Sequence, residues 1–458
     1  MLAIHADTPF SRRRLLTAGG LALGGFSLSH LLAAEAPAKL HTGKAVIFLF
    51  QQGGPSQFET FDPKPDAAAE IRTVTGVTKT SVPGVVFGDS MAKLAERADK
   101  FTVVRSYATA NGEHNIEPIV GPNSLNANIG ALYSRVVGPT DPVTSVPTSA
   151  IVYPQSVDAK VAKGQGRGDL AATGNVGGAF APFVAGGTGQ LQKNLRLSLP
   201  TDRFSDRREL LARLDDLRRD TEPQYEQFDQ RQRQACEVLL SGSVADALDL
   251  TREDPKVLAA YDTAAFVAKD DWKKADRGKR GYYTGHAKTI GKTLLLARRL
   301  CEAGCGFVTI HTGYEGVWDM HADGNNLNML DGMEAVGRAF DHAVAAFVDD
   351  LEARGLADKI LLVATGEMGR TPRLNKNGGR DHWSRLAPLL LYGRGGHRGA
   401  VVGPSALDGG GAAEVGGGHP NTVSTILHTV FDGGRVRLKP ELAAVAKLGE
   451  VKPIGDRP

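Results

Sequence analysis

The stretch KILLVATGEMGRTPRLNKNGGRDHW, residues 359–383, contains the features that decide the fold. Its first seven residues, Lys359–Thr365, form a short apolar run of the kind that predicts a fully buried strand in a parallel sheet. Glu367 follows almost at once, and an Asp381-His382 pair stands further on among glycines and arginines. Two interpretations compete for this polar segment: a solvated surface loop, or the rim of a functional site.

Similar apolar runs recur along the chain and alternate with helical patterns. The predicted strands are Lys44–Gln52, Phe101–Tyr107, Thr148–Pro154, Gly306–Thr312, Lys359–Thr365 and Leu386–Gly393. Helical spacing of apolar residues predicts helices over Asp89–Lys100 and Met333–Gly355. Strands that alternate with helices predict an α/β fold, with a mostly parallel sheet between helices. Residues 201–300 differ, because charged amphipathic patterns dominate there and predict an inserted helical region.

Composition describes an ordinary soluble globular protein. The 458 residues are 41% hydrophobic and 23% charged, and 54 basic against 51 acidic residues give a formal charge of +3. This balance shows no electrostatic footprint of nucleic-acid binding, so we expect no nucleic-acid partner. The three cysteines do not make a disulfide framework. Cys301 and Cys305 are four apart on a predicted helix, where we expect them to pack as small apolar groups.

The N-terminus carries an export pattern. Residues 11–16, SRRRLL, are similar to the twin-arginine signal, and residues 36–38, APA, offer a cleavage site after an apolar run. We therefore expect residues 1–38 to be a twin-arginine signal peptide, and the export machinery to be a partner. The mature residues 39–458 are then expected in the periplasm or outside the cell, without spanning a membrane. The alternative is an N-terminal membrane anchor, since the apolar run is about long enough to span a bilayer.

Histidines and carboxylates follow the predicted strands at their carboxyl ends. Asp319 and His321, in WDMH, are two apart, which lets a turning backbone direct both side chains into one pocket. Ligands bind at the carboxyl ends of strands in open α/β sheets. We therefore expect Glu367, Asp381 and His382 to lie at the same sheet edge as Asp319 and His321 and to converge with them on one site. Carboxylate and imidazole together suit zinc, iron or manganese.

Two arginines of the same loop suggest what such a site would bind. Arg370 and Arg380 are expected to hold an oxyanion through bidentate hydrogen bonds, unless they are solvated loop charges. A divalent ion beside them would activate water, or offset the charge of a phosphoryl or sulfuryl group during transfer. His342 and His428 fall within helical patterns, and we expect structural roles for both.

From Lys44 to about residue 433, the chain resembles the exported family called domain of unknown function 1501, which belongs to the alkaline phosphatase and sulfatase superfamily. The resemblance rests on FLFQQGGPSQFETFDPKP, FTVVRSYATANGEHN, LLARRLCEAGCGFVTIHTGYEGVWDMH, FDHAVAAFVDDLEARGLADKILLVATGEMGRTP, GGRDHW and PNTVSTILHTVFD. It implies an alkaline phosphatase-like fold for residues 39–458, with a metal site at the strand ends. The superfamily's ligands would fall on Asp319, His321 and His382.

The chain departs from the superfamily pattern at several positions. Glu367-Met368 stands where alkaline phosphatases have an Asp-His ligand pair, so the carboxylate remains and the imidazole is gone. Gln51 or Gln52 replaces the aspartate that ends the first strand. These departures imply that at least one of the usual two metal sites is impaired.

The nucleophile is not assignable from this pattern. His114 or Asn115 lies near the expected position, with Ser106 and Thr109 upstream, and Ser56 is a further candidate hydroxyl. Histidine at this position suits general acid or base catalysis, because it titrates near neutrality.

The sequence therefore predicts an exported, metal-assisted hydrolase of phosphate or sulfate esters, acting on a small-molecule or glycan ester. The expected cofactor is a divalent metal: zinc, manganese or calcium. The candidate ligands are Asp319, His321, Glu367, Asp381 and His382, and the candidate catalytic residues are His114, Ser56 and Arg370. The alternatives are a non-catalytic member that binds an anionic glycan or envelope component, and a purely structural envelope protein.

Overall fold

The computed structural model of the protein describes residues 39–161, 166–185, 203, 242–267, 277–314, 316–393, 398–414 and 416–455. The chain divides into two compact units, Met1–Leu40 and His41–Pro458, and the features below belong to the second. The expected signal peptide, residues 1–38, and much of the expected helical region, residues 204–241, lie outside the described residues. Within the described ranges, every helix is too short or too polar to cross a bilayer.

An eight-stranded sheet forms the centre of the protein. Its strands, in spatial order, are β12 (Val401–Val402), β4 (Phe101–Tyr107), β11 (Ala387–Tyr392), β8 (Ile360–Thr365), β1 (Ala45–Phe50), β7 (Phe307–His311), β5 (Ser149–Val152) and β6 (Phe183–Ala185). Only β11 runs antiparallel to its neighbours in this sheet. The predicted mostly parallel sheet is confirmed, although β6 and β12 were not predicted because they are too short for a periodic pattern.

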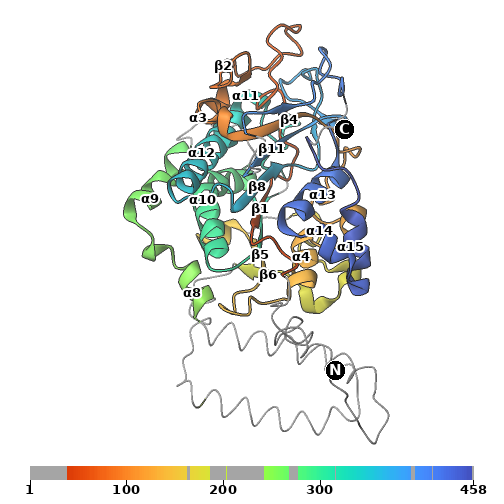
Figure 1. Cartoon of the computed structure of the whole chain (residues 1–458). Helices are drawn as coiled ribbons and strands as arrows, with labels where there is room; N and C mark the ends of the chain where they lie inside the picture. The colour runs from red at the N-terminus through yellow and green to blue at the C-terminus, as the bar shows by residue number, and fades with distance from the viewer. Residues whose placement is uncertain are drawn as a thin grey trace, which may run out of the picture. The chain divides into compact units, whose positions relative to one another are not determined.

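Helices cover both faces of the sheet (Figure 1). On one side lie α10 (Arg277–Glu302) and α12 (Arg338–Ala353), with the shorter α3 (Ala92–Ala95), α8 (Ser243–Leu248), α9 (Pro255–Ala260) and α11 (Met329–Gly332). On the other side lie α4 (Ile129–Val137), α13 (His419–Val430), α14 (Gly433–Arg437) and α15 (Ala443–Leu448). Because both faces are covered, all six residues of β1 are buried, which explains its continuous apolar sequence.

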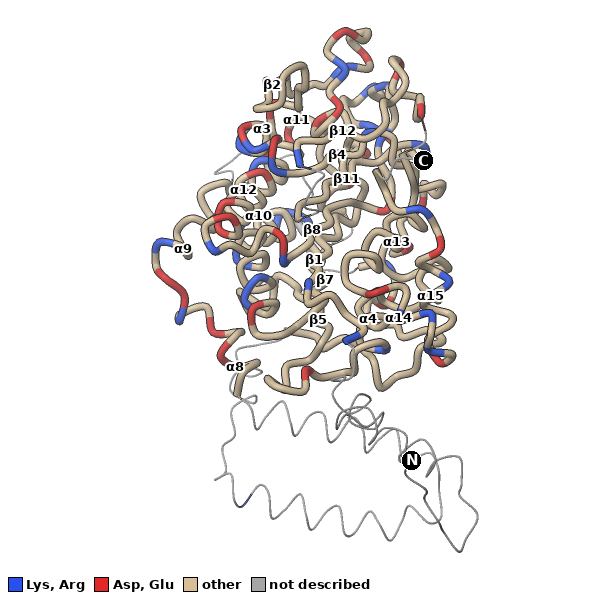
Figure 2. Tube along the Cα trace, in the orientation of Figure 1, with Lys and Arg blue, Asp and Glu red and all other residues tan. Residues whose placement is uncertain are grey.

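Basic residues predominate along α10 and acidic residues along α12, so charges of both signs lie on this side of the sheet (Figure 2). Buried Arg298 of α10 pairs with Glu253 at 2.7 Å, and Arg354 beyond α12 pairs with the same carboxylate at 2.8 Å. The described part of the charged helical region is therefore tied to the domain by ion pairs. Cys301 and Cys305 are both free thiols, and Cys305 is fully buried.

The carboxyl ends of the central strands lie at one edge of the sheet. Phe50 at the end of β1 pairs with His311 of β7 and Thr365 of β8, so these three strands end at the same level. β4 runs in the same direction, because it is antiparallel to β11, which is antiparallel to β8. β11 therefore begins at this edge. The preceding hairpin of β9 (Gly369–Arg370) and β10 (His382–Trp383) joins the polar loops there.

Candidate metal centre

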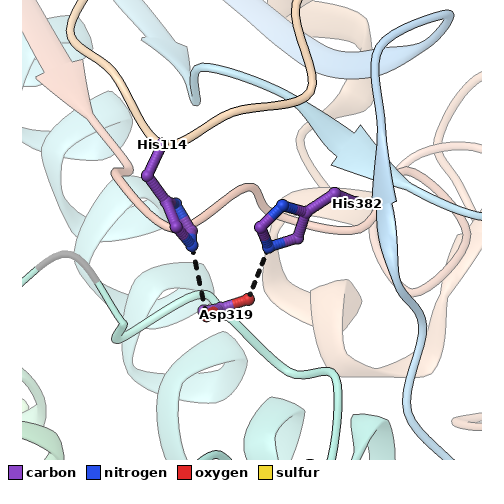
Figure 3. A group of neighbouring side chains, drawn as sticks. All are labelled: His114, Asp319 and His382. Carbon is purple, nitrogen blue, oxygen red and sulfur yellow. Dashed lines mark hydrogen bonds and ion pairs between the residues drawn. The ribbon is translucent and has the colours of Figure 1, made fainter.

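Three side chains from separate loops converge at this edge (Figure 3). His114 follows β4, Asp319 follows β7 and His382 begins β10, and one potential ligand atom from each lies within 4.8 Å of the other two. His114 Nε2 lies 3.2 Å from Asp319 Oδ2, and His382 Nε2 lies 3.3 Å from Asp319 Oδ1. Two imidazole nitrogens thus face opposite oxygens of one carboxylate.

The outer nitrogen of each imidazole has its own acceptor. His114 Nδ1 donates to Glu367 Oε1 at 2.9 Å, and His382 Nδ1 donates to the Gly112 carbonyl at 2.9 Å. Each acceptor takes the Nδ1 hydrogen, so Nε2 is the nitrogen of each ring that faces Asp319 and that would bind a metal. Histidines that bind metals in proteins are oriented in this way. Two imidazoles and one carboxylate fit zinc or manganese, and three protein ligands leave a position for water.

Asp319 is held in its ionised form by hydrogen-bond donors at both of its oxygens. Its Oδ1 accepts from Arg370 Nη2 at 2.7 Å, and its Oδ2 accepts from Asn326 Nδ2 at 3.0 Å, in addition to the histidines. Burial by itself would raise the pKa of Asp319. The hydrogen bonds from the histidines and the charge of Arg370 outweigh burial and hold that pKa far below its usual range. The carboxylate is therefore ready to bind a cation.

His114 lies between two carboxylates. Burial would lower its pKa, but the hydrogen bonds to Asp319 and Glu367 raise the pKa to about 9 when no metal is bound. At neutral pH the metal-free site therefore holds a proton on His114 Nε2. A metal ion at this nitrogen has to replace that proton.

Metal affinity should consequently rise with pH. Below pH 9, we expect the affinity for zinc to increase about tenfold per pH unit, with release of about one proton per ion. Calorimetric titration in buffers of different ionisation enthalpy measures this proton count. The metal-free fold should show the opposite trend: the raised pKa of His114 stabilises it fully below pH 6.5, and this contribution is lost as the pH approaches 9. A zinc affinity independent of pH, with no proton released, would contradict this assignment.

A family model described as protein of unknown function (DUF1501) matches residues 43–432. The chain belongs to the DUF1501 family. The family resemblance inferred from the sequence is thereby confirmed. No curated protein matches the DUF1501 chain significantly.

Several solved structures are similar to the DUF1501 chain. Ps i-CgsB shows 12% identity over 84% of this chain and 72% of that chain, with a TM-score of 0.31. A Bacteroides thetaiotaomicron protein, described under the metabolism of multiple glycosaminoglycans, shows 9% identity. The match covers 89% of this chain and 73% of that chain, with a TM-score of 0.37. The lipoteichoic acid synthase LtaP from Listeria monocytogenes shows 9% identity. The match covers 84% of this chain and 72% of that chain, with a TM-score of 0.29.

Glu367 and His321 lie beside the three convergent residues of the DUF1501 chain. Glu367 is fully buried and accepts from the Gly53 amide at 2.9 and 3.1 Å as well as from His114. It therefore orients His114, whereas the sequence had suggested that it binds the metal itself. His321 Nε2 lies 3.0 Å from Asp319 Oδ2, but His321 is not in the group whose ligand atoms all lie within 4.8 Å of one another.

Asp381, which was expected to be a metal ligand, is not in the convergent group of His114, Asp319 and His382. Its side chain is exposed, and its Oδ1 accepts from Asn375 Nδ2 at 3.0 Å. Asp381 directly precedes strand β10, which begins at His382. Neighbouring residues of an extended chain point to opposite sides, so the inward direction of His382 turns Asp381 outward.

The two arginines that were expected to hold an oxyanion are both buried and bonded within the protein, so neither is a solvated loop charge. Arg370 is fully buried and donates to the Gly54 carbonyl at 2.8 Å and to the Arg380 carbonyl at 3.1 Å, besides Asp319. Arg380 is fully buried too and pairs with Glu59 at 3.0 Å. Each nitrogen of both guanidinium groups has such a partner within the protein, as a buried guanidinium requires.

Ser56, the candidate hydroxyl nucleophile, is bound elsewhere. It is buried, and its hydroxyl donates to Glu59 Oε2. His114, expected as a catalytic acid or base, instead presents Nε2 to the carboxylate of the cluster. Its position after β4 indicated that it was important, but its role depends on contacts with residues more than 200 positions away. The segment 366–383 thus borders the cluster of His114, Asp319 and His382 and is not simply a solvated loop.

Proposed function

We propose that this DUF1501 protein is a metal-assisted hydrolase of phosphate or sulfate esters, acting on a small-molecule or glycan ester. The observation that carries the proposal is the convergence of His114, Asp319 and His382, with the outer nitrogen of each imidazole already bound to an acceptor. A divalent ion at these residues would supply a Lewis acid and lower the pKa of a bound water. This donor set fits zinc or manganese better than calcium, which prefers oxygen ligands.

The surrounding residues maintain this site. Arg370 offsets the buried charge of Asp319, and Glu367 keeps the Nδ1 proton of His114 in place. Neither needs to move during a reaction. Such fixed partners keep the ligands in the orientation that binding requires.

His321 is the proposed acid–base group of the site. Its side chain is 23% exposed, and its Nε2 lies 2.9 Å from Asn326 Nδ2. Lys279 donates to Asn326 Oδ1 at 3.0 Å, which turns the amide nitrogen toward His321. We propose that the attacking water takes the place of Asn326 at His321 Nε2 and gives its proton to this nitrogen, and that the imidazole later delivers the proton to the leaving alcohol.

Turnover and metal content measured on matched variants test the proposal. Aryl phosphates, phosphonates and sulfates would be screened with manganese, zinc and calcium. We expect His114→Ala to lose bound metal and turnover together. The control is Asp381→Ala, which removes an exposed carboxylate next to His382 and should preserve both. Turnover that survives in His114→Ala would contradict the proposal.

Loss of the His321 imidazole should separate catalysis from metal binding. We expect His321→Ala to retain bound metal and to lose about 100- to 10,000-fold in kcat, the usual contribution of a general acid or base. His428→Ala is the matched control, because His428 is an exposed histidine of α13 bonded to the Gly449 carbonyl at 2.8 Å. If His321→Ala instead loses the metal, His321 is a ligand rather than a proton carrier.

A non-catalytic binding protein is the second candidate. The observation that favours it is the bond from Ser56 to Glu59, which occupies the one hydroxyl proposed near the first strand. Such a protein would bind an anionic ester without hydrolysing it. Stoichiometric metal and saturable binding of the ester, with no turnover in any metal form, would establish this candidate and exclude the hydrolase.

We also propose export by the twin-arginine route, to the periplasm or beyond. The support is the SRRRLL pattern at residues 11–16 and the APA site at residues 36–38. Replacement of Arg12 and Arg13 by lysine should retain the full-length chain in the cytoplasm, as shown by cell fractionation. Unchanged processing and export of that variant would contradict the route.

A further inference from the structure

The turn after β1 contacts the residues that orient the metal cluster. The Gly53 amide donates to Glu367, which orients His114. The Gly53 and Gly54 carbonyls accept from Arg370, which binds Asp319. The backbone of one turn thus supports both the imidazole and the carboxylate sides of the cluster.

Gln52, at the start of this turn, uses its whole amide group for hydrogen bonds within the protein. Its Nε2 donates to the Asn115 carbonyl at 2.8 Å and to the Arg167 carbonyl at 3.3 Å. Its Oε1 accepts from the Arg167 amide at 3.2 Å and from His311 Nε2 at 2.9 Å. Asn115 is the residue directly after His114, so Gln52 holds the loop that carries a proposed ligand.

His311 determines which way the Gln52 amide points. The Gly313 amide donates to His311 Nδ1 at 2.9 Å, so Nε2 carries the hydrogen and donates to Gln52 Oε1. Burial lowers the pKa of His311 to about 4, so the ring stays neutral at physiological pH. The ring lies between Phe50 and Tyr153, with ring centroids 5.9 and 5.7 Å away. A reversed amide would place donor against donor, and His311 therefore keeps Gln52 Nε2 directed at Asn115.

We propose that Gln52, oriented by His311, is a positioning residue that holds the His114 loop in place for metal binding. Gln52 acts through the Asn115 carbonyl and is not itself a ligand, because its amide atoms are all engaged. The inference rests on the proposed function only in taking the cluster of His114, Asp319 and His382 as a metal site. Gln52 thereby has a role of its own, whereas the sequence indicated it only as a replacement for the aspartate ligand of the superfamily.

Zinc affinity, measured by competition with a chelator on the mature protein, tests the inference without requiring turnover. We expect Gln52→Ala and Gln52→Glu to weaken zinc binding by about 10- to 100-fold, the usual effect of removing a partner of a metal ligand. Gln52→Glu keeps the shape of the side chain but cannot donate to Asn115 or Arg167. His311→Ala should show a similar loss, and His311→Gln, whose amide can still donate to Gln52, should recover part of it.

The matched control is His419→Ala. His419 is also a buried imidazole whose pKa burial lowers to about 4, and its Nε2 has no hydrogen-bond partner among the described residues. We expect the zinc affinity of the His419→Ala variant to stay close to that of the wild type. The thermal unfolding temperature of each metal-free variant is measured in parallel, because a merely structural role would shift this temperature and leave the zinc affinity unchanged.

Zinc affinity that is unchanged in folded Gln52 variants would overturn the inference and leave the proposed function intact. A wild type that binds no zinc, manganese or calcium would instead contradict the proposed function, and the inference with it. If Gln52→Ala fails to fold, Gly166→Ala decides, together with Gln52→Glu. A Cβ at Gly166 would lie 3.2 Å from His311 Cε1 and 3.4 Å from Gln52 Oε1, which disturbs the same bond from outside. Wild-type zinc affinity in both Gly166→Ala and Gln52→Glu would refute the role of Gln52.

Discussion

Replacement of Asp319 by asparagine should abolish metal binding. Asp319 is the only carboxylate in the group of three convergent residues found among the described residues, and both its oxygens face an imidazole. An amide is a poor ligand and carries no charge to offset a dication. We expect zinc affinity to fall by more than the roughly 10- to 100-fold typical of partners outside the ligand set. Metal analysis after reconstitution, with chelator competition, measures the loss.

Asp323→Asn provides the control for this change. Asp323 is an exposed carboxylate four residues further on, and its Oδ2 lies 3.7 Å from His321 Nε2. Its loss lowers the negative charge near the site by the same amount and should leave zinc binding near the wild-type level. Circular dichroism must confirm that Asp319→Asn folds, because Arg370 then lacks its buried counter-charge. A folded Asp319→Asn protein with wild-type zinc affinity would show that the cluster is not the metal site.

Loss of Arg380 should destabilise the fold more than any exposed substitution. Arg380 and Glu59 are both fully buried and paired at 3.0 Å, and the guanidinium lies 4.4 Å from the centre of the Phe58 ring. Arg380→Met leaves the Glu59 carboxylate buried without its cation. We expect the free energy of unfolding to fall by about 3–5 kcal/mol, the usual cost of breaking a buried ion pair from one side. Chemical denaturation of the metal-free protein measures it.

Arg338→Met is the matched control for that prediction. Arg338 forms a 2.8 Å ion pair with Glu334 four residues earlier, and the two side chains are 55% and 48% exposed. Its loss should cost only about 0–1 kcal/mol. The double variant Arg380→Met with Glu59→Gln should recover part of the stability, because no lone buried charge remains. Equal effects of Arg380→Met and Arg338→Met would show that the buried pair is not needed for stability.

The central strands could be predicted from the sequence, because the apolar pattern that marks a buried strand is local. Lys44–Gln52 and Lys359–Thr365 are continuous apolar runs, and the structure places β1 and β8 within them, fully buried. Polar residues just after such strands could be expected at one sheet edge. Asp319 and His382 do meet there, although 63 positions separate them.

The roles of individual polar residues could not be predicted, because burial depends on distant contacts. Arg380 looked like a solvent-facing clamp, yet its partner Glu59 lies 321 positions away. Glu367 and Asp381 looked equally suited to bind metal. Only the contact of Glu367 with His114, 253 positions away, and the outward direction of Asp381 separate them. Gln52 appeared as a lost ligand because its four hydrogen bonds come from three remote segments.

The most direct test of the central claim is the position of a bound ion. Crystals of the mature protein soaked with zinc, with diffraction recorded at the zinc absorption edge, locate the metal by its anomalous signal. We predict one strong peak with His114 Nε2, His382 Nε2 and an Asp319 oxygen at about 2.0–2.2 Å. A peak bound by other residues, or no peak at this cluster in crystals that contain zinc, would contradict the account.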